Sequence, residues 1–320
     1  MAGILAFDTS NYTTSAAYLD AKTGRGANVS RLLPVRQGEL GLRQSDAVFA
    51  HVKALPEITA QLMAQEEREA PRIFAASTRP RAKAGSYMPC FLVGEGTARA
   101  MASAQGADFY AFSHQQGHIA AAVFSSGRTE LMEKPFLAWH LSGGTTELLF
   151  VRPDREEIVT EEIVGGTTDI SAGQLIDRAG VLLGMGFPAG KSLAAMADAE
   201  PSDERYGLRV KDCRFSLSGM ENQVKALYEK TAPPAAIANF VINTVARAIM
   251  RATEQALERW PGLPVLCSGG VASNERIRRV MRNTYDAAFA RPELSTDNAM
   301  GVAILAAIRS EGKIPEWTLL

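Results

Sequence analysis

The sequence is poor in cysteine and almost free of net charge, and these shortages exclude several classes of protein. Its 320 residues include three cysteines, Cys90, Cys213 and Cys267, which are odd in number and lack the spacing of a metal finger. They argue against a disulfide framework and favour a reducing compartment such as the cytoplasm. The formal net charge is −1, so no overall field attracts nucleic acid or a membrane. Any such contact must come from a local patch.

Long apolar runs are also missing. No segment approaches the length that crosses a bilayer, so we expect no association with a membrane. The first residues lack the basic start of a signal peptide, and Ile4 already begins an apolar strand, which predicts a cytoplasmic protein. The sequence contains neither a Walker loop nor a HExxH motif. It therefore shows no sign of P-loop nucleotide binding or of zinc-protease chemistry.

What the sequence does contain is an internal repeat. The segment 4–19, ILAFDTSNYTTSAAYL, returns at 136–151 as FLAWHLSGGTTELLFV. Each copy reads as an apolar strand, a turn of small hydroxyl or glycine residues, and a second apolar strand. Such a turn presents backbone N–H groups and hydroxyls at the mouth of a sheet, which suits a phosphate. The repeat predicts a duplicated domain that holds a nucleotide between its halves, although short hairpins also resemble each other by chance.

Strands are expected to alternate with helices after each hairpin, which is typical of α/β layers. The spacing of apolar residues predicts helices over 45–65, 90–105, 114–124, 171–183, 234–259, 275–283 and 297–310. Short strands are predicted over 72–77, 108–113, 156–164, 263–268 and 288–290. We expect a first domain over 1–112, completed by about 296–320, and a second over 113–295 that carries the metal and nucleotide motifs.

His114 and His118 are four residues apart on the helix predicted over 114–124, with Ser113 as its N-cap. Their imidazoles would project from one face about one turn apart, which suits two ligands of one metal ion. A carboxylate has to complete such a site, and Asp297, in the turn before the last predicted helix, is the candidate. The alternatives are a packed histidine pair and an aspartate that only caps a helix.

Three glycine-rich turns, at 142–146, 184–190 and 269–274, are candidate contacts to a nucleotide. The first is the turn of the second hairpin, and the last joins a buried strand to a helix. The middle one has the alternative role of a helix stop. Asp177, on the helix before it, either accepts hydrogen bonds from ribose hydroxyls or forms a surface salt bridge.

Basic residues gather at two places in the sequence. One is the short helix predicted over 275–283, which carries Arg276, Arg278, Arg279 and Arg282. Such a face is either solvated or contacts the phosphate backbone of a nucleic acid. The other is a loop with Arg79, Arg81 and Lys83.

Taken in order, the motifs resemble the tRNA N6-adenosine threonylcarbamoyltransferase family, formerly called glycoprotease-like or O-sialoglycoprotein endopeptidase-like. The resemblance runs from Ile4 to about Ile308. It rests on Asp8-Thr9-Ser10, SHQQGH at 113–118, LSGGTTEL at 141–148, SAGQLIDR at 171–178 with GMGFPAG at 184–190, FSLSGMEN at 215–222, SGGVASNERIR at 268–278 and STDNAMGVAI at 295–304. That family belongs to the actin, Hsp70 and sugar-kinase superfamily. The resemblance therefore implies an α/β fold of duplicated actin-like ATPase (ribonuclease H-like) domains with a nucleotide cleft between them.

The resemblance also implies a metal site. The ligands of one divalent metal ion, iron or zinc, would be His114, His118 and Asp297. In the alignment of the two hairpins His140 stands opposite Asp8, at a position where the family often has a tyrosine near the metal. His140 is therefore either a further ligand or a buried histidine. Asp8 and Ser10, in the first turn, are the candidate catalytic residues.

The implied ligand is an ATP- or AMP-type nucleotide or threonylcarbamoyl-AMP. Its adenosine half would contact Asp177, Gly190 and Asn274, and its phosphates would face Ser142, Gly143 and Gly144. The implied reaction transfers the threonylcarbamoyl group to the exocyclic amine of the adenosine next to the tRNA anticodon, or is a closely related carbamoyl-type transfer. The arginine helix would contact the tRNA. The protein partner would be a small actin-like subunit or a second copy of the chain.

The chain departs from the family pattern at several positions. The loop Thr78–Pro89, TRPRAKAGSYMP, replaces a threonine-x-glycine-proline-glycine loop near the nucleotide and the partner surface. Ile170 and Gln174 replace acidic residues, and Gln115-Gln116 stand between the histidines. These differences indicate a diverged paralogue. The alternative functions are a non-catalytic nucleotide- and metal-binding paralogue that assembles with the tRNA-modification machinery and, ranked last, a small-molecule kinase.

Overall fold

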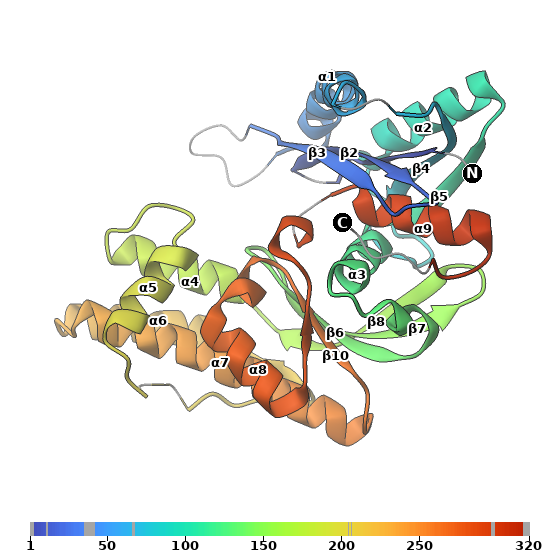
Figure 1. Cartoon of the computed structure of the whole chain (residues 1–320). Helices are drawn as coiled ribbons and strands as arrows, with labels where there is room; N and C mark the ends of the chain where they lie inside the picture. Colours follow the sequence, from blue (N-terminus) through green and yellow to red (C-terminus); the bar gives the residue numbers. More distant parts are fainter. Residues whose placement is uncertain are drawn as a thin grey trace. The chain divides into compact units, whose positions relative to one another are not determined.

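The computed structural model describes residues 3–10, 12–34, 42–65, 68–203, 205, 207–295 and 298–315. The chain divides into two compact units. The first unit comprises Met1–Lys134, Arg152–Glu161 and Glu293–Leu320, and the second comprises Pro135–Val151 and Glu162–Pro292. Each unit is built on a β-sheet that carries packed helices (Figure 1). None of the helices in the described parts of the chain is both long and apolar enough to cross a membrane.

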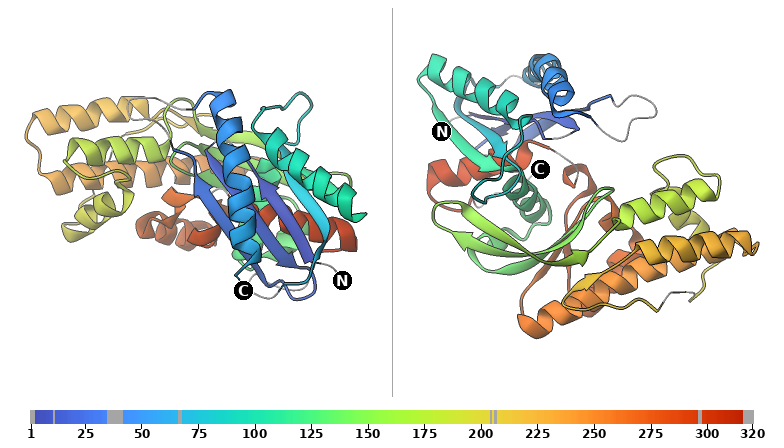
Figure 2. Two further views of the ribbon diagram at one scale, coloured as in Figure 1. Left: turned by 90° about the horizontal axis from the view of Figure 1, so that it is seen from above. Right: turned by 180° about the vertical axis from the view of Figure 1, so that it is seen from behind.

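The first unit contains a five-stranded sheet of order β3-β2-β1-β4-β5. Its antiparallel strands are β1 (Gly3–Asp8), β2 (Thr13–Asp20) and β3 (Gly26–Leu32). β4 (Pro71–Arg79) runs parallel to β1, and β5 (Asp108–Ser113) runs parallel to β4. Helices α1 (Gln44–Met63) and α2 (Phe91–Gln105) pack on one face, and α3 (His114–Ser125) and α9 (Met300–Glu311) on the other (Figure 1 and Figure 2). Buried Phe7 and Phe74 fill the core under α1 and α2.

Most of a six-stranded sheet of order β11-β10-β6-β7-β8-β9 lies in the second unit, while the ends of β7 and β8 within Arg152–Glu161 belong to the first. The strands are β6 (Phe136–Leu141), β7 (Thr146–Asp154), β8 (Ile158–Thr167), β9 (Arg214–Phe215), β10 (Val265–Ser268) and β11 (Ala288–Phe289). The helices are α4 (Ala172–Leu182), α5 (Gly190–Ala199), α6 (Ser218–Glu229), α7 (Pro234–Arg259) and α8 (Glu275–Tyr285). Fully buried Trp139 joins the sheet to α7, since its indole N–H donates to Thr253 Oγ1 at 2.9 Å.

The two hairpins of the repeat have the same register. In the first hairpin Asp8 pairs with Ser15, and in the second His140 pairs with Glu147. His140 is the counterpart of Asp8 in the repeat and Glu147 is the counterpart of Ser15, so equivalent residues pair in both hairpins. In each sheet the first strand of the hairpin is extended by two parallel strands, β4 and β5 in one and β10 and β11 in the other. The predicted duplicated α/β fold is confirmed.

Helix α3 lies in the first unit, whereas the sequence predicts a boundary after residue 112. The reason is the close packing of α3 on α9. A Cβ added at Gly301 would overlap the carbonyl oxygen of Gly117, and a Cβ at Gly117 would lie 3.2 Å from Val302 Cγ2. Two glycines therefore let the helix backbones touch, and this contact keeps the histidine motif with the first sheet.

Candidate functional site

The turn after β1 and the start of α3 bring three of the predicted site residues together. Nδ1 of His114 lies 2.7 Å from Oδ2 of Asp8, and Nε2 of His114 lies 3.0 Å from Nε2 of His118. The two imidazole rings meet edge to face, with centroids 4.3 Å apart. The Asp8 carboxylate is buried, and the His114 side chain is 19% exposed. One nitrogen of His114 is thus held by a carboxylate while the other faces His118.

This arrangement fits a metal ion. Two imidazole nitrogens that each bind one ion at about 2.1 Å lie roughly 3 Å apart when the angle between them is near 90°. A carboxylate on Nδ1 fixes the tautomer that leaves the Nε2 lone pair available, as in carboxylate–histidine–metal triads. Among the described residues no group of three His, Cys, Asp or Glu side chains could hold the ion alone. The predicted ligand Asp297 lies outside the described residues.

The start of α3 is fixed by the predicted N-cap, Ser113. Ser113 Oγ accepts the N–H of Gln116 at 3.1 Å, and the N–H of Ser113 donates to Oε1 of Gln116 at 2.7 Å. Together these bonds form a capping box. His114 is the first residue of the helix and lies inside this box. Its backbone is consequently held on both sides by hydrogen-bonded neighbours.

Ser10, the other candidate catalytic residue, lies beside Asp8. Its N–H donates to Oδ1 of Asp8 at 2.9 Å. Its Oγ is buried and makes no hydrogen bond with any of the residues that the structure describes. A buried hydroxyl without a partner costs about 1–3 kcal/mol, so Ser10 Oγ is a candidate contact for a bound molecule.

In the second unit the turn at 142–144 is fixed by hydrogen bonds, and its two glycines border open space. The N–H of Ser142 donates to the carbonyl of Thr145 at 2.8 Å, and Ser171 Oγ donates to the carbonyl of Gly143 at 2.6 Å. Within the described parts of the chain, neither Gly143 nor Gly144 donates its own N–H to a partner. The space where a Cβ would stand is open at both glycines. Two such N–H groups suit a phosphate.

The glycine-rich segment after β10 lies against the same turn. Gly269, with φ +97°, passes so close to the carbonyl of Leu141 that an added Cβ would overlap it. Because β6 and β10 are parallel, their carboxyl ends meet at one edge of the sheet, where ligands bind in α/β folds. At the end of this segment, Oδ1 of Asn274 accepts the N–H groups of Arg276 and Ile277 and caps α8. The predicted adenosine contact Asn274 therefore has a capping role as well.

Asp177 joins α4 to the start of α5. Its Oδ1 accepts the N–H of Ala189 at 2.8 Å, which brings Gly190 next to it. The described residues form no ion pair with Asp177, so the surface salt bridge considered as its alternative role is not seen among them. At the start of α4, Gly173 packs on Gly143 so closely that a Cβ would not fit. Helix α4 thus connects the phosphate-facing turn to Asp177 and Gly190.

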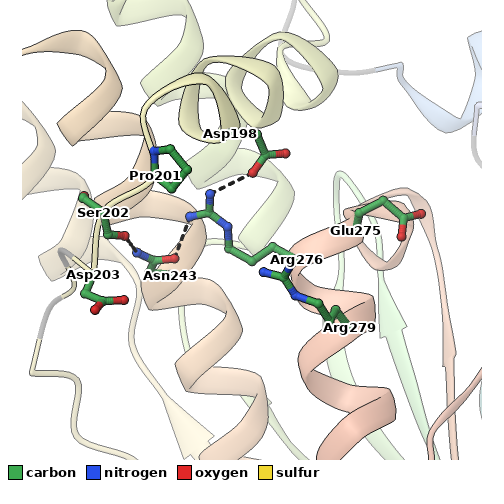
Figure 3. Close-up of a pocket in the computed structure, with 8 residues that line it drawn as sticks. All are labelled: Asp198, Pro201, Ser202, Asp203, Asn243, Glu275, Arg276 and Arg279. Carbon is green, nitrogen blue, oxygen red and sulfur yellow. Dashed lines mark hydrogen bonds and ion pairs between the residues drawn. The ribbon is translucent and has the colours of Figure 1, made fainter.

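The arginines of α8 have different surroundings. The guanidinium of Arg276 is largely buried and donates to Oδ1 of Asn239 at 2.8 Å. It also donates to Oδ1 of Asn243 and of Asp198, each at 2.8 Å (Figure 3). A side chain held in this way supports the packing of α8 on α7 and α5. Arg276 therefore has a structural role whether or not tRNA binds nearby.

Arg278 and Arg282 both lie over the ring of Phe289, at 4.7 and 5.3 Å from its centroid. Arg279 is exposed and has no ion pair among the described residues. It borders an open cavity of about 600 Å³ (Figure 3). The lining residues are Asp198, Pro201, Ser202, Asp203, Asn243, Glu275, Arg276 and Arg279. Of the four arginines, Arg279 is the one best placed to meet a phosphate backbone.

His140 lies on β6, where it pairs with Glu147 on one side and with Ser268 of β10 on the other. It belongs to the second unit, whereas His114 and His118 belong to the first. Its role as a further metal ligand stays a prediction.

Comparison with known families identifies the chain. The model of the tRNA N6-adenosine threonylcarbamoyltransferase family matches residues 41–304. The chain belongs to this family. The match spans the histidine pair, the glycine turns and the arginine helix, so the resemblance carried by the motifs is confirmed. The members of this family are transferases that modify tRNA.

Solved structures support the fold. The chain is similar to HypF from T. kodakarensis, with a TM-score of 0.58 and 15% identity over 100% of this chain and 50% of that one. A full-length HypF in a phosphate- and nucleotide-bound form gives a TM-score of 0.58 and 14% identity over 96% of this chain and 55% of that one. The chain thus spans about half the length of both HypF proteins. An activator of 2-hydroxyisocaproyl-CoA dehydratase from Clostridium difficile with bound ADPNP gives a TM-score of 0.51 and 14% identity over 97% of this chain and 96% of that one. At these identities the similarity shows the actin-like fold.

Proposed function

We propose that the chain transfers a threonylcarbamoyl group from threonylcarbamoyl-AMP to the N6 amine of the adenosine next to the tRNA anticodon, with the help of a metal ion. The observation that carries this proposal is the histidine pair. In a chain of this transferase family, Nε2 of His114 and Nε2 of His118 lie 3.0 Å apart, and the Asp8 carboxylate holds the opposite side of the His114 ring.

His114 and His118 would hold a divalent ion, iron or zinc, with Asp297 and His140 as the proposed further ligands. When bound, such an ion supplies a Lewis acid for phosphate and carbamoyl oxygens. Asp8 acts through His114, because its Oδ2 takes the Nδ1 side of the ring. We therefore assign Asp8 a positioning role and keep Ser10, whose buried Oγ has no hydrogen-bond partner among the described residues, as the residue of this turn that would contact the substrate.

The second unit would bind the AMP half of the donor. Gly143 and Gly144 border open space, and their N–H groups would bind the phosphate. Asp177 uses one oxygen on the N–H of Ala189, and its second oxygen would accept a ribose hydroxyl. Gly190 and Asn274 would contact the rest of the adenosine.

In the transfer, the N6 amine attacks the carbamoyl carbon of the donor. The bond from that carbon to the phosphate oxygen breaks, AMP leaves with the bonding electron pair, and N6 loses one proton. The donor is already a mixed anhydride with a good leaving group. The main contribution of the protein is therefore orientation, which converts an encounter of two molecules into a reaction within one complex.

Mass spectrometry of tRNA nucleosides tests the proposal. The purified chain is incubated with threonylcarbamoyl-AMP, an unmodified tRNA transcript and the other proteins of the modification pathway. We expect threonylcarbamoyladenosine to form, and His114→Ala and His118→Ala to abolish it. No product from a chain that still binds nucleotide and metal would support the non-catalytic paralogue instead. ATP-dependent phosphorylation of a small molecule would support a kinase.

A protein partner is proposed as well, either a small actin-like subunit or a second copy of this chain. Large apolar side chains on α1 and α2 are exposed in the first unit: Phe49 is 66% exposed, Val52 53% and Leu92 52%. We propose that the partner covers this part of the surface. Sedimentation of the chain alone and with the subunit distinguishes the two, and Phe49→Ser should weaken whichever complex forms.

A further inference from the structure

Two departures from the family pattern meet at one residue, Glu157. Gln116, from the histidine motif, places its Nε2 3.2 Å from Oε2 of Glu157. Arg79, from the altered loop, places its Nη2 2.9 Å from Oε1 and 2.8 Å from Oε2 of the same carboxylate. Glu157 lies in the turn between β7 and β8. This turn and the adjoining strand ends form the segment Arg152–Glu161, which belongs to the first unit together with Arg79 and Gln116. The three side chains therefore form one cluster within one compact unit.

Gln116 links this cluster to the histidine turn. Its side chain is fully buried. Oε1 of Gln116 accepts the N–H of Ser113 at 2.7 Å, and Nε2 donates to the carbonyls of Glu157 at 2.6 Å and Val159 at 3.0 Å. His114 lies between Ser113 and Gln116. The amide of Gln116 thus ties the backbone around His114 to the β7–β8 segment.

The altered loop Thr78–Pro89 is also hydrogen-bonded to the first turn of α3. The carbonyl of Pro80 accepts the N–H of Gln115, the second residue of α3, at 3.0 Å. Two residues further on, the N–H of Ala82 donates to Oε1 of Glu161 at 3.3 Å. The loop is therefore attached both to the first turn of α3 and to the β7–β8 segment, and the Arg79–Glu157 ion pair fixes its beginning.

We propose that Gln116, Glu157 and Arg79 form a positioning network for the metal-binding histidines. This inference rests on the proposed function, because it assumes that His114 and His118 bind a metal ion. The three side chains act through the backbone of the turn that carries His114. Groups that hydrogen-bond directly to ligating side chains change metal affinity by about 10- to 100-fold. Because this network holds the backbone beside His114, we expect an effect at the lower end of that range.

Titration of the purified full chain with Co²⁺, followed by visible absorption, tests the inference. The variants are Gln116→Met, Glu157→Met and Arg79→Met, two of which leave α3 untouched. We expect each to raise the Kd for Co²⁺ about tenfold and to change the shape of the absorption band, which reports ligand geometry. Because Arg79 acts through Glu157, the double variant that combines Arg79→Met with Glu157→Met should bind Co²⁺ no more weakly than Glu157→Met alone. Without metal, the amides of His114 and Gln115 should exchange hydrogen faster in all three variants.

Gln174→Met is the matched control. Gln174 forms the same capping box with Ser171 at α4, through bonds of 3.0 Å in both directions, but it is exposed and lies in the second unit. Its loss should leave Co²⁺ binding unchanged. Equal affinity and equal spectra in the wild type and the three network variants would overturn the inference. A wild-type chain that binds no Co²⁺ would instead overturn the proposed metal site, and the inference with it.

Discussion

Oδ2 of Asp8 lies 2.7 Å from Nδ1 of His114, and this contact joins the end of β1 to the first residue of α3. Oδ1 of Asp8 accepts the N–H of Ser10 at 2.9 Å. A single buried carboxylate thus orders both the first hairpin turn and the histidine motif.

Asp8→Asn is expected to weaken metal binding without unfolding the chain. The amide has the shape of the carboxylate but lacks the negative charge that supports a metal-bound imidazole from behind. We expect the Kd for Zn²⁺, measured by competition with a chelator, to rise about 10- to 100-fold. Asp20→Asn is the control, since Oδ1 of Asp20 accepts the N–H of Lys22 at 2.8 Å in the next turn, away from the histidines. Unchanged Zn²⁺ affinity in Asp8→Asn would contradict the positioning role.

Gly301→Ala is expected to destabilise the first unit. The added Cβ would overlap a backbone atom of Gly117, so α3 and α9 must move apart. Overpacking of this kind costs about 1–3 kcal/mol of the free energy of unfolding, which urea denaturation measures. Gly96→Ala, in the middle of α2 with no atom near the new Cβ, should instead stabilise by about 0.5–1 kcal/mol. Equal stability of the two variants would show that the close helix contact is not formed.

Periodicity in the sequence predicts the elements that bury a broad apolar face. The helix predicted over 234–259 coincides with α7, which buries residues along its whole length. The helices α5 and α6 and the strand β3 are not predicted. Each buries very little, for example only Met220 and Val224 in α6 and only Val29 in β3. The apolar pattern of such elements is weak, although α8, which buries only Ile277 and Met281, is predicted.

The candidate site is predictable where it depends on local spacing and unpredictable where it depends on tertiary contacts. The spacing of His114 and His118 suffices to predict that their rings meet. The approach of Asp8 to His114 depends on how β1 and α3 pack, and no sequence pattern reports it. The same holds for Glu157, which lies in a charged hairpin segment with no motif of its own.

Two arginines of α8 are expected to have different roles: Arg276 stabilises the fold, and Arg279 contacts tRNA. Arg276→Gln should lower the free energy of unfolding by about 1–3 kcal/mol, because it leaves the oxygens of Asn239 and Asn243 without their donor. Arg279→Gln should leave stability unchanged. It should weaken tRNA binding and reduce the slope of log affinity against log salt by about one. Filter binding at several salt concentrations measures this, and equal slopes would rule out a phosphate contact by Arg279.

The hydrogen bonds of Asp169 lead us to expect that acid lowers the stability of the second unit. Oδ1 accepts the N–H groups of Leu217 and Ser218 at 2.8 and 3.2 Å, and Oδ2 accepts the hydroxyls of Ser216 and Ser218 at 2.5 and 2.6 Å. Partial burial raises the pKa of Asp169, but the four hydrogen bonds outweigh it and lower the pKa from 3.8 to about 2. The charged carboxylate is therefore favoured in the folded state and holds the start of α6 against the end of β8.

Since the folded pKa lies below the unfolded value, the unfolded chain binds more protons between about pH 4 and pH 2. The stability contributed by Asp169 is complete above this window and is lost as the pH falls through it. Asp169→Asn has no proton to gain, so its free energy of unfolding should be lower at pH 7 and should fall less steeply with acid. Urea denaturation of both proteins from pH 7 to pH 3 measures the difference. Parallel curves would mean that the four donors do not hold a charged carboxylate.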